Sequence, residues 1–146
     1  MSIADRERAQ QLLSECNGRG VSSIQCDKLH LEIVFEDRSS FITQSTWRLF
    51  LRGNLLMGNN DQASEELLSH LQGLKVVSNS ISDHWDTRLV FEKDYVLEVI
   101  CDSVRYEAWE AHVETGLVIF APGGTTVFPP AERSRAELFR MPPKSS

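Results

Sequence analysis

Apolar residues recur at helical spacing near the start of the chain. Between Asp5 and Cys16 they lie three and four residues apart on one side, with charged residues opposite, and this spacing predicts an amphipathic helix. The apolar side consists of Ala9, Leu12, Leu13 and Cys16. Gly18 follows, and a glycine ends a helix readily because it adopts the left-handed conformation at little steric cost.

The same spacing returns in the middle of the chain. Asn60 or Asp61 can cap a second helix, and Glu65 and Glu66 suit its positively polarised first turn. The residues expected to face the core are Leu67, Leu68 and Leu71. Gly73 then ends this helix.

Alternating apolar and polar residues follow each helix and predict strands. In the first half of the chain, residues 29–36 alternate, residues 36–39 form a turn, and residues 40–51 return as one or two strands. The residues expected on one face of that return are Trp47, Leu49 and Leu51.

The second half predicts a longer meander. Strands are expected over 88–92, 95–101, 106–113 and 117–121, each paired with the next. Pro122-Gly123-Gly124 then forms a turn, because glycine tolerates positive φ and proline has no N–H to donate to a ladder.

The two halves also resemble each other. One block over residues 12–24 returns over 67–81, and residues 31–36 return as 87–92. The matching residues of the first block are Leu12, Leu13, Ser14, Gly18 and Val21, which return as Leu67, Leu68, Ser69, Gly73 and Val76. The offset is 55 residues in the first block and 56 in the second. This common order and nearly constant offset indicate an internal duplication.

These elements predict an α+β fold. We expect two duplicated α-β-β-β-β units, over about 4–59 and 60–128, related by a pseudo-twofold axis, with helices packed on one face of antiparallel sheets. Together the units would form a single domain over 1–128. The remaining tail, 129–146, is predicted to form a short basic helix over 131–140 and then to fray.

Composition and charge narrow the classes of function. The chain is 41% hydrophobic and 25% charged, which excludes a largely disordered chain, a coiled coil and a collagen-like fibre. The segment Asp83–Glu114 holds nine acidic and three basic residues, and therefore the whole formal net charge of −6. An acidic surface repels phosphate backbones and attracts basic proteins, so we expect a basic protein partner and no nucleic acid. The alternative is that these acids simply face water.

The sequence lacks the patterns typical of signal peptides, membrane spans and zinc sites, and this bears on its location and cofactors. The first residues have no apolar run of the kind found in signal peptides, and no apolar stretch is long enough to span a bilayer, so a cytoplasmic protein with no membrane partner is expected. The three cysteines and four histidines match no zinc spacing, so we expect reduced thiols and no cofactor.

The stretch Tyr106–His112 is the most distinctive part of the chain. On an extended strand, Tyr106, Glu110 and His112 share one face, where the last two could hold a metal or a proton or simply contact each other. Trp109, on the other face, is either a core residue or part of a binding site. Tyr106 and the acids near it are candidates for an exposed recognition surface, because tyrosine supplies a large contact area at little entropic cost.

Trp85 stands in a loop between His84 and Asp86, before the strand expected over 88–92. Two roles are open for it: an exposed anchor for a partner, or a buried plug at the end of a hairpin.

The second half of the chain, from Leu68 to Phe128, resembles a family of small bacterial proteins of unknown function. The resemblance rests on Leu89-Val90-Phe91-Glu92, Tyr106-Glu107-Ala108-Trp109-Glu110, Gly116-Leu117-Val118-Ile119 and Pro122-Gly123-Gly124. The family's hairpin carries Asp-Gly where this chain has Lys93-Asp94. Proteins of this size and type are similar to immunity proteins of bacterial toxin systems, which is an association rather than a mechanism.

No catalytic motif is present, so we expect a non-enzymatic protein-binding protein. The missing catalytic motif, the acidic segment Asp83–Glu114 and the resemblance together favour an immunity protein that occludes the active site of a cognate toxin. The residues expected to contact the partner are Trp85, Asp94, Glu98, Asp102, Tyr106, Glu107, Glu110 and His112. One alternative is a small-ligand or metal site, catalytic or not, in a cleft between the repeats; another is a structural homodimer.

Overall fold

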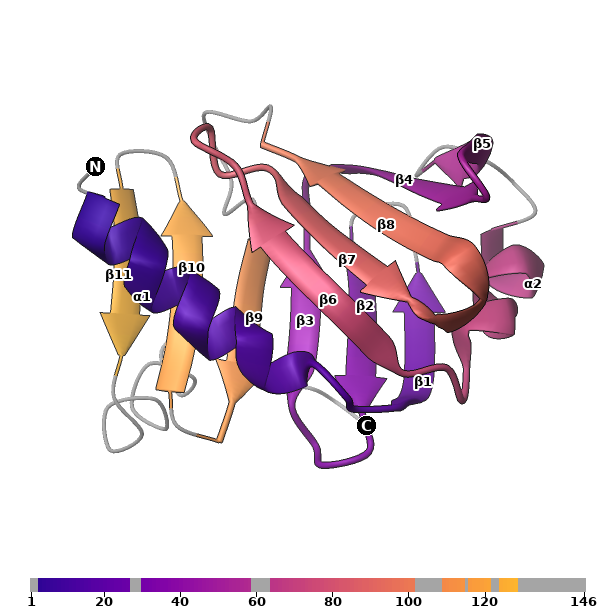
Figure 1. Ribbon diagram of the computed structural model, residues 1–146, viewed down its shortest axis with the longest axis horizontal. Coiled ribbons are helices and arrows are strands. Elements are labelled where there is room, and N and C mark those ends of the chain that lie inside the picture. The colour runs from indigo at the N-terminus through magenta and orange to yellow at the C-terminus, as the bar shows by residue number, and fades with distance from the viewer. Residues whose placement is uncertain are drawn as a thin grey trace, which may run out of the picture.

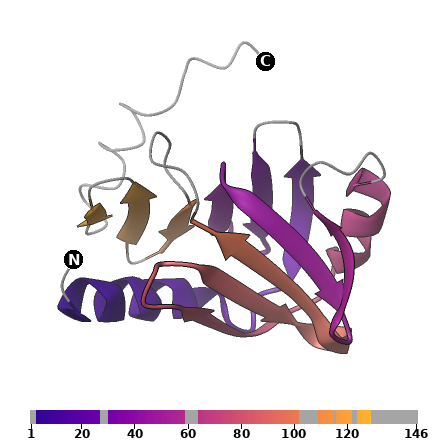
Figure 2. The same cartoon turned by 90° about the horizontal axis from the view of Figure 1, so that it is seen from above.

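Two antiparallel β-sheets packed face to face make up most of the described chain (Figures 1 and 2). The structure is a computed structural model and describes residues 3–26, 30–58, 64–101, 109–114, 116–121 and 124–128. The sheets with a few short helices confirm the α+β class. The tail 129–146 and its predicted helix lie outside the described residues.

The larger sheet has six strands in the order β1-β2-β3-β9-β10-β11. Their bounds are β1 Val21–Cys26, β2 Leu31–Phe35, β3 Ser40–Thr43, β9 Trp109–Val113, β10 Gly116–Ala121 and β11 Gly124–Phe128. The smaller sheet has five strands in the order β5-β4-β8-β7-β6. Their bounds are β4 Thr46–Leu51, β5 Asn54–Gly58, β6 Val76–Ile81, β7 Thr87–Phe91 and β8 Tyr95–Ile100.

The helices stand where the sequence predicts them, although the second is short. Helix α1 spans Ile3–Leu13 and α2 spans Ser64–Leu68, and each runs into a 3-10 turn, Ser14–Cys16 and Ser69–Leu71. Helix α1 lies in the same layer as the five-stranded sheet, contacts β9, β10 and β11, and borders β6 (Figure 2). Within the described residues, neither helix has the length and apolar run needed to cross a bilayer.

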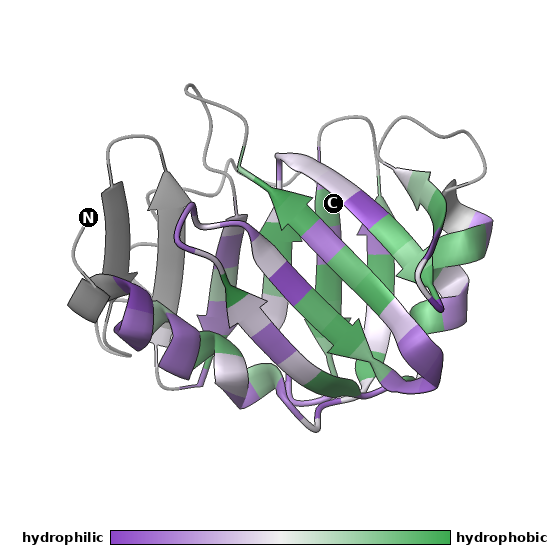
Figure 3. Ribbon diagram, turned by 45° about the horizontal axis from the view of Figure 1, so that its top comes forward, coloured by the Kyte–Doolittle hydropathy of each residue, from purple (hydrophilic) through white to green (hydrophobic). Residues whose placement is uncertain are grey.

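Alternation along the strands determines which side chains fill the space between the sheets. On β4, Trp47 and Leu49 are buried while Arg48 between them is exposed, and Trp109 and Ala111 are likewise buried on β9. Trp109 is therefore a core residue. Its ring stacks on the buried ring of Phe41, with the two centroids 5.8 Å apart. Figure 3 shows that β7 and β8 are mostly apolar, with a hydrophilic band interrupting each strand.

Each half of the chain contributes strands to both sheets. The chain leaves the six-stranded sheet after Thr43 and enters the other at Thr46; it returns between Ile100 and Trp109. The predicted continuous meander over 88–121 is therefore wrong, because β8 pairs with β7 and β4 whereas β9 pairs with β3 and β10. Alternation specifies which side of a strand is buried, but it does not specify the neighbouring strand.

Reciprocal backbone hydrogen bonds join the segments that follow the two helices. The N–H of Gly18 donates to the carbonyl of Val76 at 2.7 Å, and the N–H of Gly73 donates to the carbonyl of Val21 at 2.8 Å. Both glycines have positive φ, 80° and 86°, as expected for residues that end a helix. Strands β1 and β6 each begin with a bulge against their partner strand at matching positions.

Two hairpin turns use positive φ outside glycine. Lys93 and Asp94, between β7 and β8, have φ of 61° and 66°, a conformation that Asp-Gly would adopt with less strain. Arg52 and Gly53, between β4 and β5, have φ of 52° and 81°. The second turn allows β5 to fold directly back along β4, where it forms one edge of the five-stranded sheet.

Candidate functional site

The predicted contact residues are scattered in the structure. Asp94 is exposed in the turn before β8, and Glu98 is half-buried in the middle of that strand. The predictions for Asp102, Tyr106 and Glu107 fall outside the described residues.

Glu98 lies between two arginines on the outer face of the five-stranded sheet, the face turned away from the six-stranded sheet. In the register of the strands it stands beside Arg48 on β4 and Arg88 on β7, and both arginines are exposed. Neighbouring strands are about 4.8 Å apart, so these unlike charges offset one another. Glu98 is therefore flanked by positive charge rather than set in an acidic patch.

Other acids of the segment Asp83–Glu114 are also compensated locally. Asp83 forms an ion pair with Arg6 of α1, at the end of β6. At the opposite end of the sheet, an oxygen of the Glu92 carboxylate accepts the N–H of Lys75 at 2.8 Å. In the part of the chain that the structure describes, the acids of this segment are therefore divided between the two sheets. Those on the five-stranded sheet lie at both of its ends and in its middle, and Glu110 lies on β9 of the six-stranded sheet.

Trp85 is buried, with 3% of the residue exposed. Its carbonyl accepts the Nε1–H of Trp109 at 3.0 Å and contacts the Sγ of Cys101 at 2.8 Å, and its φ is 66°. The residue therefore closes one end of the space between the sheets. This burial fits the hairpin plug and not the exposed anchor.

Glu110 and His112 are close together on β9. The imidazole Nε2 of His112 lies 2.6 Å from Oε1 of Glu110, and their side chains are only 13% and 9% exposed. They point to the side of β9 opposite the buried Trp109 and Ala111, and so away from the five-stranded sheet. The pair therefore does not face the space between the two sheets.

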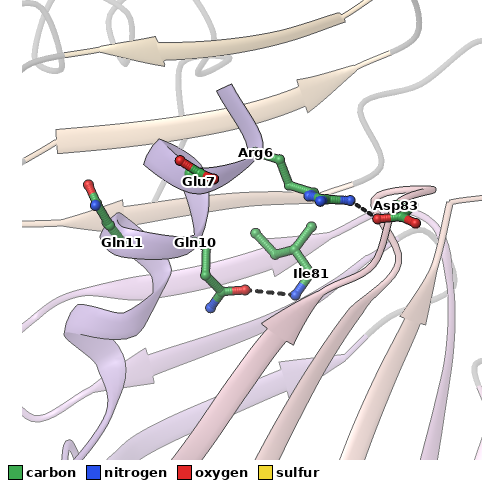
Figure 4. A pocket seen from close by; sticks show the side chains of 6 residues that line it. All are labelled: Arg6, Glu7, Gln10, Gln11, Ile81 and Asp83. Carbon is green, nitrogen blue, oxygen red and sulfur yellow. Dashed lines mark hydrogen bonds and ion pairs between the residues drawn. The ribbon is translucent and has the colours of Figure 1, made fainter. Parts of the chain in front are cut away.

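No metal-binding cluster is found in the described ranges, where no three His, Cys, Asp or Glu side chains gather closely enough. An open cavity of about 410 Å³ lies between α1 and the end of β6 (Figure 4). Its lining residues are Arg6, Glu7, Gln10, Gln11, Ile81 and Asp83. Arg6 pairs with Asp83 and Gln10 accepts the N–H of Ile81, so these groups join the helix to the strand.

A row of apolar side chains crosses the outer face of the five-stranded sheet. We define the apolar row as Leu55 on β5, Phe50 on β4, Val96 on β8 and Val90 on β7, which the strand register places side by side. Leu55 is 60% exposed and the other three are half-buried. No described element lies over this face in Figure 1.

The sequence contained a signal for this row. Leu89, Val90 and Phe91 are consecutive apolar residues on β7, so an alternating strand must turn one of them outward. The outward residue is Val90. The same holds for Val96 and Phe50, which have apolar neighbours on both sides. Clustered apolar side chains on an uncovered sheet face are typical of protein–protein contact surfaces.

Two ionisable groups with displaced pKa values lie near the 3-10 turn after α1. Burial, with a contribution from the nearby Asp37 carboxylate, raises the pKa of the Cys16 thiol to about 12. Partial burial acts to raise the pKa of Asp37, but hydrogen bonds from Ser39 and the charge of Arg19 outweigh it and lower that pKa. Neither group is part of the apolar row.

Comparison with known proteins gave no match. No family model matches the chain, and no curated protein or solved structure matches it.

Proposed function

We propose that this chain is a non-enzymatic protein-binding protein whose partner docks on the outer face of the five-stranded sheet. The observation that carries the proposal is the apolar row, which runs across four adjacent strands with no described element over it. Interface cores favour such apolar patches rimmed by arginine. Arg48 and Arg88 border the row on the neighbouring positions of β4 and β7.

The biological role we propose is that of a bacterial immunity protein, which would neutralise a toxin by covering its active site. This part rests on the similarity of proteins of this size and type to bacterial immunity proteins, and on the absence of a catalytic motif from the sequence. The geometry of the outer face changes the charge that we expect on the partner. The outer face presents two exposed arginines beside a half-buried Glu98, so a partner of mixed charge fits it better than a strongly basic one.

We also propose that the fold arose by duplication, with a pseudo-twofold axis between the copies. The reciprocal hydrogen bonds of Gly18 and Gly73 support this, as do the matching bulges of β1 and β6. The strand orders support it too, since β1-β2-β3-β9-β10 corresponds position by position to β6-β7-β8-β4-β5. In this arrangement the copies exchange their last strands.

The test is capture of the partner from the native host with matched baits. Wild-type chain should retain one protein in roughly stoichiometric amount. Val96→Glu should lose it, because a carboxylate in the middle of the apolar row would be desolvated on binding. Gln11→Glu is the control, since it adds the same charge at an exposed position on α1. Equal recovery with both variants, or no protein retained, would overturn the proposal.

The toxin role has a separate readout. If the retained protein is lethal when expressed alone, co-expression of this chain should restore growth and Val96→Glu should restore less. A partner without toxicity would contradict the immunity role while leaving the binding surface in place.

A second candidate function follows from the Glu110–His112 contact. A buried carboxylate beside an imidazole can take a proton or contribute two ligands to a metal, which would make the chain a small-ligand or metal-binding protein. Zinc or a panel of nucleotides and sugars should then raise the melting temperature of the wild-type chain but not of His112→Ala. No shift with any of them would count against this candidate.

A further inference from the structure

The sequence contains one Asn-Gly dipeptide, Asn17-Gly18. It stands directly after the 3-10 turn that continues α1, and both of its residues are exposed. An asparagine followed by glycine is chemically labile, because the next backbone nitrogen can attack the side-chain amide carbon and glycine has no side chain to hinder that approach. The position of this dipeptide in the fold therefore decides whether the reaction takes place.

The fold holds the two reacting groups of this dipeptide apart. The N–H of Gly18 donates to the carbonyl of Val76 at 2.7 Å, and the nitrogen must lose that bond before it can act as a nucleophile. Oδ1 of Asn17 accepts an N–H of the Asn79 side chain at 2.7 Å. The ψ angle of Asn17 is 134°, an extended value that turns the Gly18 nitrogen away from the side chain. Both groups are therefore bound to β6 and do not face each other.

The second half of the chain has the same turn with a different side chain. Gln72-Gly73 follows the 3-10 turn after α2, and Gln72 has φ −62° and ψ 130°, close to the −61° and 134° of Asn17. The N–H of Gly73 likewise bonds across to the carbonyl of Val21. A glutamine would have to close a six-membered ring, which forms far more slowly than the five-membered ring of an asparagine. A turn of this geometry therefore accepts a stable side chain, and only the first turn carries the labile one.

We propose that Asn17 is a site of spontaneous deamidation that the fold keeps closed, and that its isoaspartate product releases α1 from β6 permanently. The co-reactant is water. Once the turn separates from β6, the Gly18 nitrogen gives its proton to a solvent base and bonds to Cγ of Asn17. The side-chain nitrogen leaves as ammonia, and a succinimide ring remains. This site is independent of the apolar row.

Water then opens the succinimide at one of its two carbonyls. Addition at Cγ breaks the new bond to the Gly18 nitrogen and leaves aspartate in an unaltered main chain. Addition at the main-chain carbonyl breaks the original peptide bond to Gly18 and leaves isoaspartate, whose main chain runs through Cβ and Cγ. In both cases the amide and water become a carboxylic acid and ammonia, and nothing is oxidised or reduced.

The two products would affect the turn differently. Aspartate at position 17 can still accept the N–H of Asn79, and it leaves Gly18 opposite Val76. Isoaspartate adds a methylene to the main chain, which displaces the Gly18 N–H from the Val76 carbonyl. The next bond, from the N–H of Val76 to the carbonyl of Arg19 at 3.1 Å, would be displaced with it. The separation of the turn from β6 then persists after the chain has closed elsewhere.

The side chain of Asn79 controls how often this turn opens. Its amide nitrogen donates to the carbonyl of Leu13 at 3.2 Å as well as to Asn17, so it attaches the end of α1 and the dipeptide to one strand. A local opening that breaks these bonds leaves the two sheets intact. The rate of deamidation follows the population of that open state.

The first test measures deamidation by peptide mass spectrometry in wild-type chain kept at mildly alkaline pH, with and without guanidinium chloride. Asn17 should react about tenfold or more slowly in the folded chain, because only the open fraction is reactive. Gln72 is the internal control and should remain unmodified under both conditions. Equal rates at Asn17 with and without denaturant would overturn the proposal, as would an Asn17 that stays intact in the unfolded chain.

The second test changes the attachment to β6. Asn79→Ala should speed deamidation of the folded chain about tenfold, as expected for the loss of a hydrogen bond to a half-buried group. Ser78→Ala is the matched control, at the adjacent exposed position of the same strand, and should leave the rate unchanged. Gln10→Ala, which weakens the same attachment from the helix, replaces Asn79→Ala if that variant does not fold. Equal rates in the wild type and in these variants would contradict control by β6.

The release of α1 is tested on aged chain. The isoaspartate form, separated by chromatography, should show faster amide hydrogen exchange at Gly18 and Val76 than fresh wild type. Asn17→Asp has the new charge in an unaltered main chain and should keep the slow exchange, and Asn17→Gln should stay unmodified on ageing. An isoaspartate form that exchanges like fresh wild type would overturn the release. Fast exchange in Asn17→Asp would also overturn it, because charge rather than the added methylene would then be the cause.

Discussion

Gln10 on α1 and Asn79 on β6 are joined through both the side chain and the backbone of Asn79. The Nε2 of Gln10 donates to the side-chain oxygen of Asn79 and also lies 3.4 Å from its carbonyl. The amide nitrogen of Asn79 in turn donates to the carbonyl of Leu13 at 3.2 Å and to Oδ1 of Asn17 at 2.7 Å. These bonds attach the first helix and the turn after it to the edge of a sheet more than 60 residues along the chain.

We therefore expect Gln10→Ala to destabilise the fold by about 1–3 kcal/mol, because it leaves half-buried backbone groups of β6 without their partner. Gln11→Ala, on the exposed side of the same helix, should change the free energy of unfolding by less than about 0.5 kcal/mol. Urea unfolding measures both. Equal effects of the two substitutions would mean that Gln10 does not close the edge.

Trp109→Phe should destabilise the chain by about 1–3 kcal/mol, because the indole N–H donates to the buried carbonyl of Trp85 and phenylalanine cannot replace that bond. Trp85 should become more mobile at the same time, and its fluorescence should shift to longer wavelength. Unchanged stability and fluorescence would contradict the role of Trp85 as the plug at this end of the core.

Asp37→Asn should lower the free energy of unfolding at neutral pH by about 1 kcal/mol. The two hydrogen bonds that Ser39 donates would then be accepted by a neutral amide oxygen instead of a charged carboxylate. The pKa of Asp37 is lower in the folded chain than its ordinary value, so its contribution is fully present above about pH 4 and disappears as pH falls below that. The difference in the free energy of unfolding between wild type and variant, measured by urea unfolding, should therefore be smaller at pH 3 than at pH 7. A constant difference between the two would argue against an ionised Asp37 as the cause.

Cys16 should resist alkylation in the folded chain. It is fully buried, and its raised pKa of about 12 leaves almost no thiolate at pH 8. Iodoacetamide labelling followed by peptide mass spectrometry should find Cys16 unmodified, whereas Cys26 and Cys101, which are partly exposed, should react faster. In urea the thiol of Cys16 should label like an ordinary cysteine. Fast labelling of Cys16 without urea would mean that α1 opens readily.

The sequence predicts the parts of this fold that depend on local pattern. The helix ends at Gly18 and Gly73 and the buried faces at Trp47 and Trp109 follow from periodicity and from the conformational freedom of glycine. The pairing of β9 with β3 does not, because it joins residues about 70 positions apart and alternation is equally satisfied by other neighbours.

The candidate site was predicted less well than the fold. Counting charge along the segment Asp83–Glu114 suggested an acidic face, but strand pairing places Arg48 beside Glu98, and these residues are 50 positions apart. Trp85 shows the same limit, since its neighbours in sequence are polar and its neighbours in space are the buried Trp109 and the half-buried Cys101. Burial across sheets depends on contacts that sequence pattern does not specify.

The most direct test of the binding surface is amide hydrogen exchange on the purified complex with the captured partner. Strands β4, β5 and β8 should exchange more slowly in the complex than in the chain alone, and β9 should be unchanged. Protection confined to the six-stranded sheet, around Glu110 and His112, would contradict the account and would place the partner on the opposite side of the molecule.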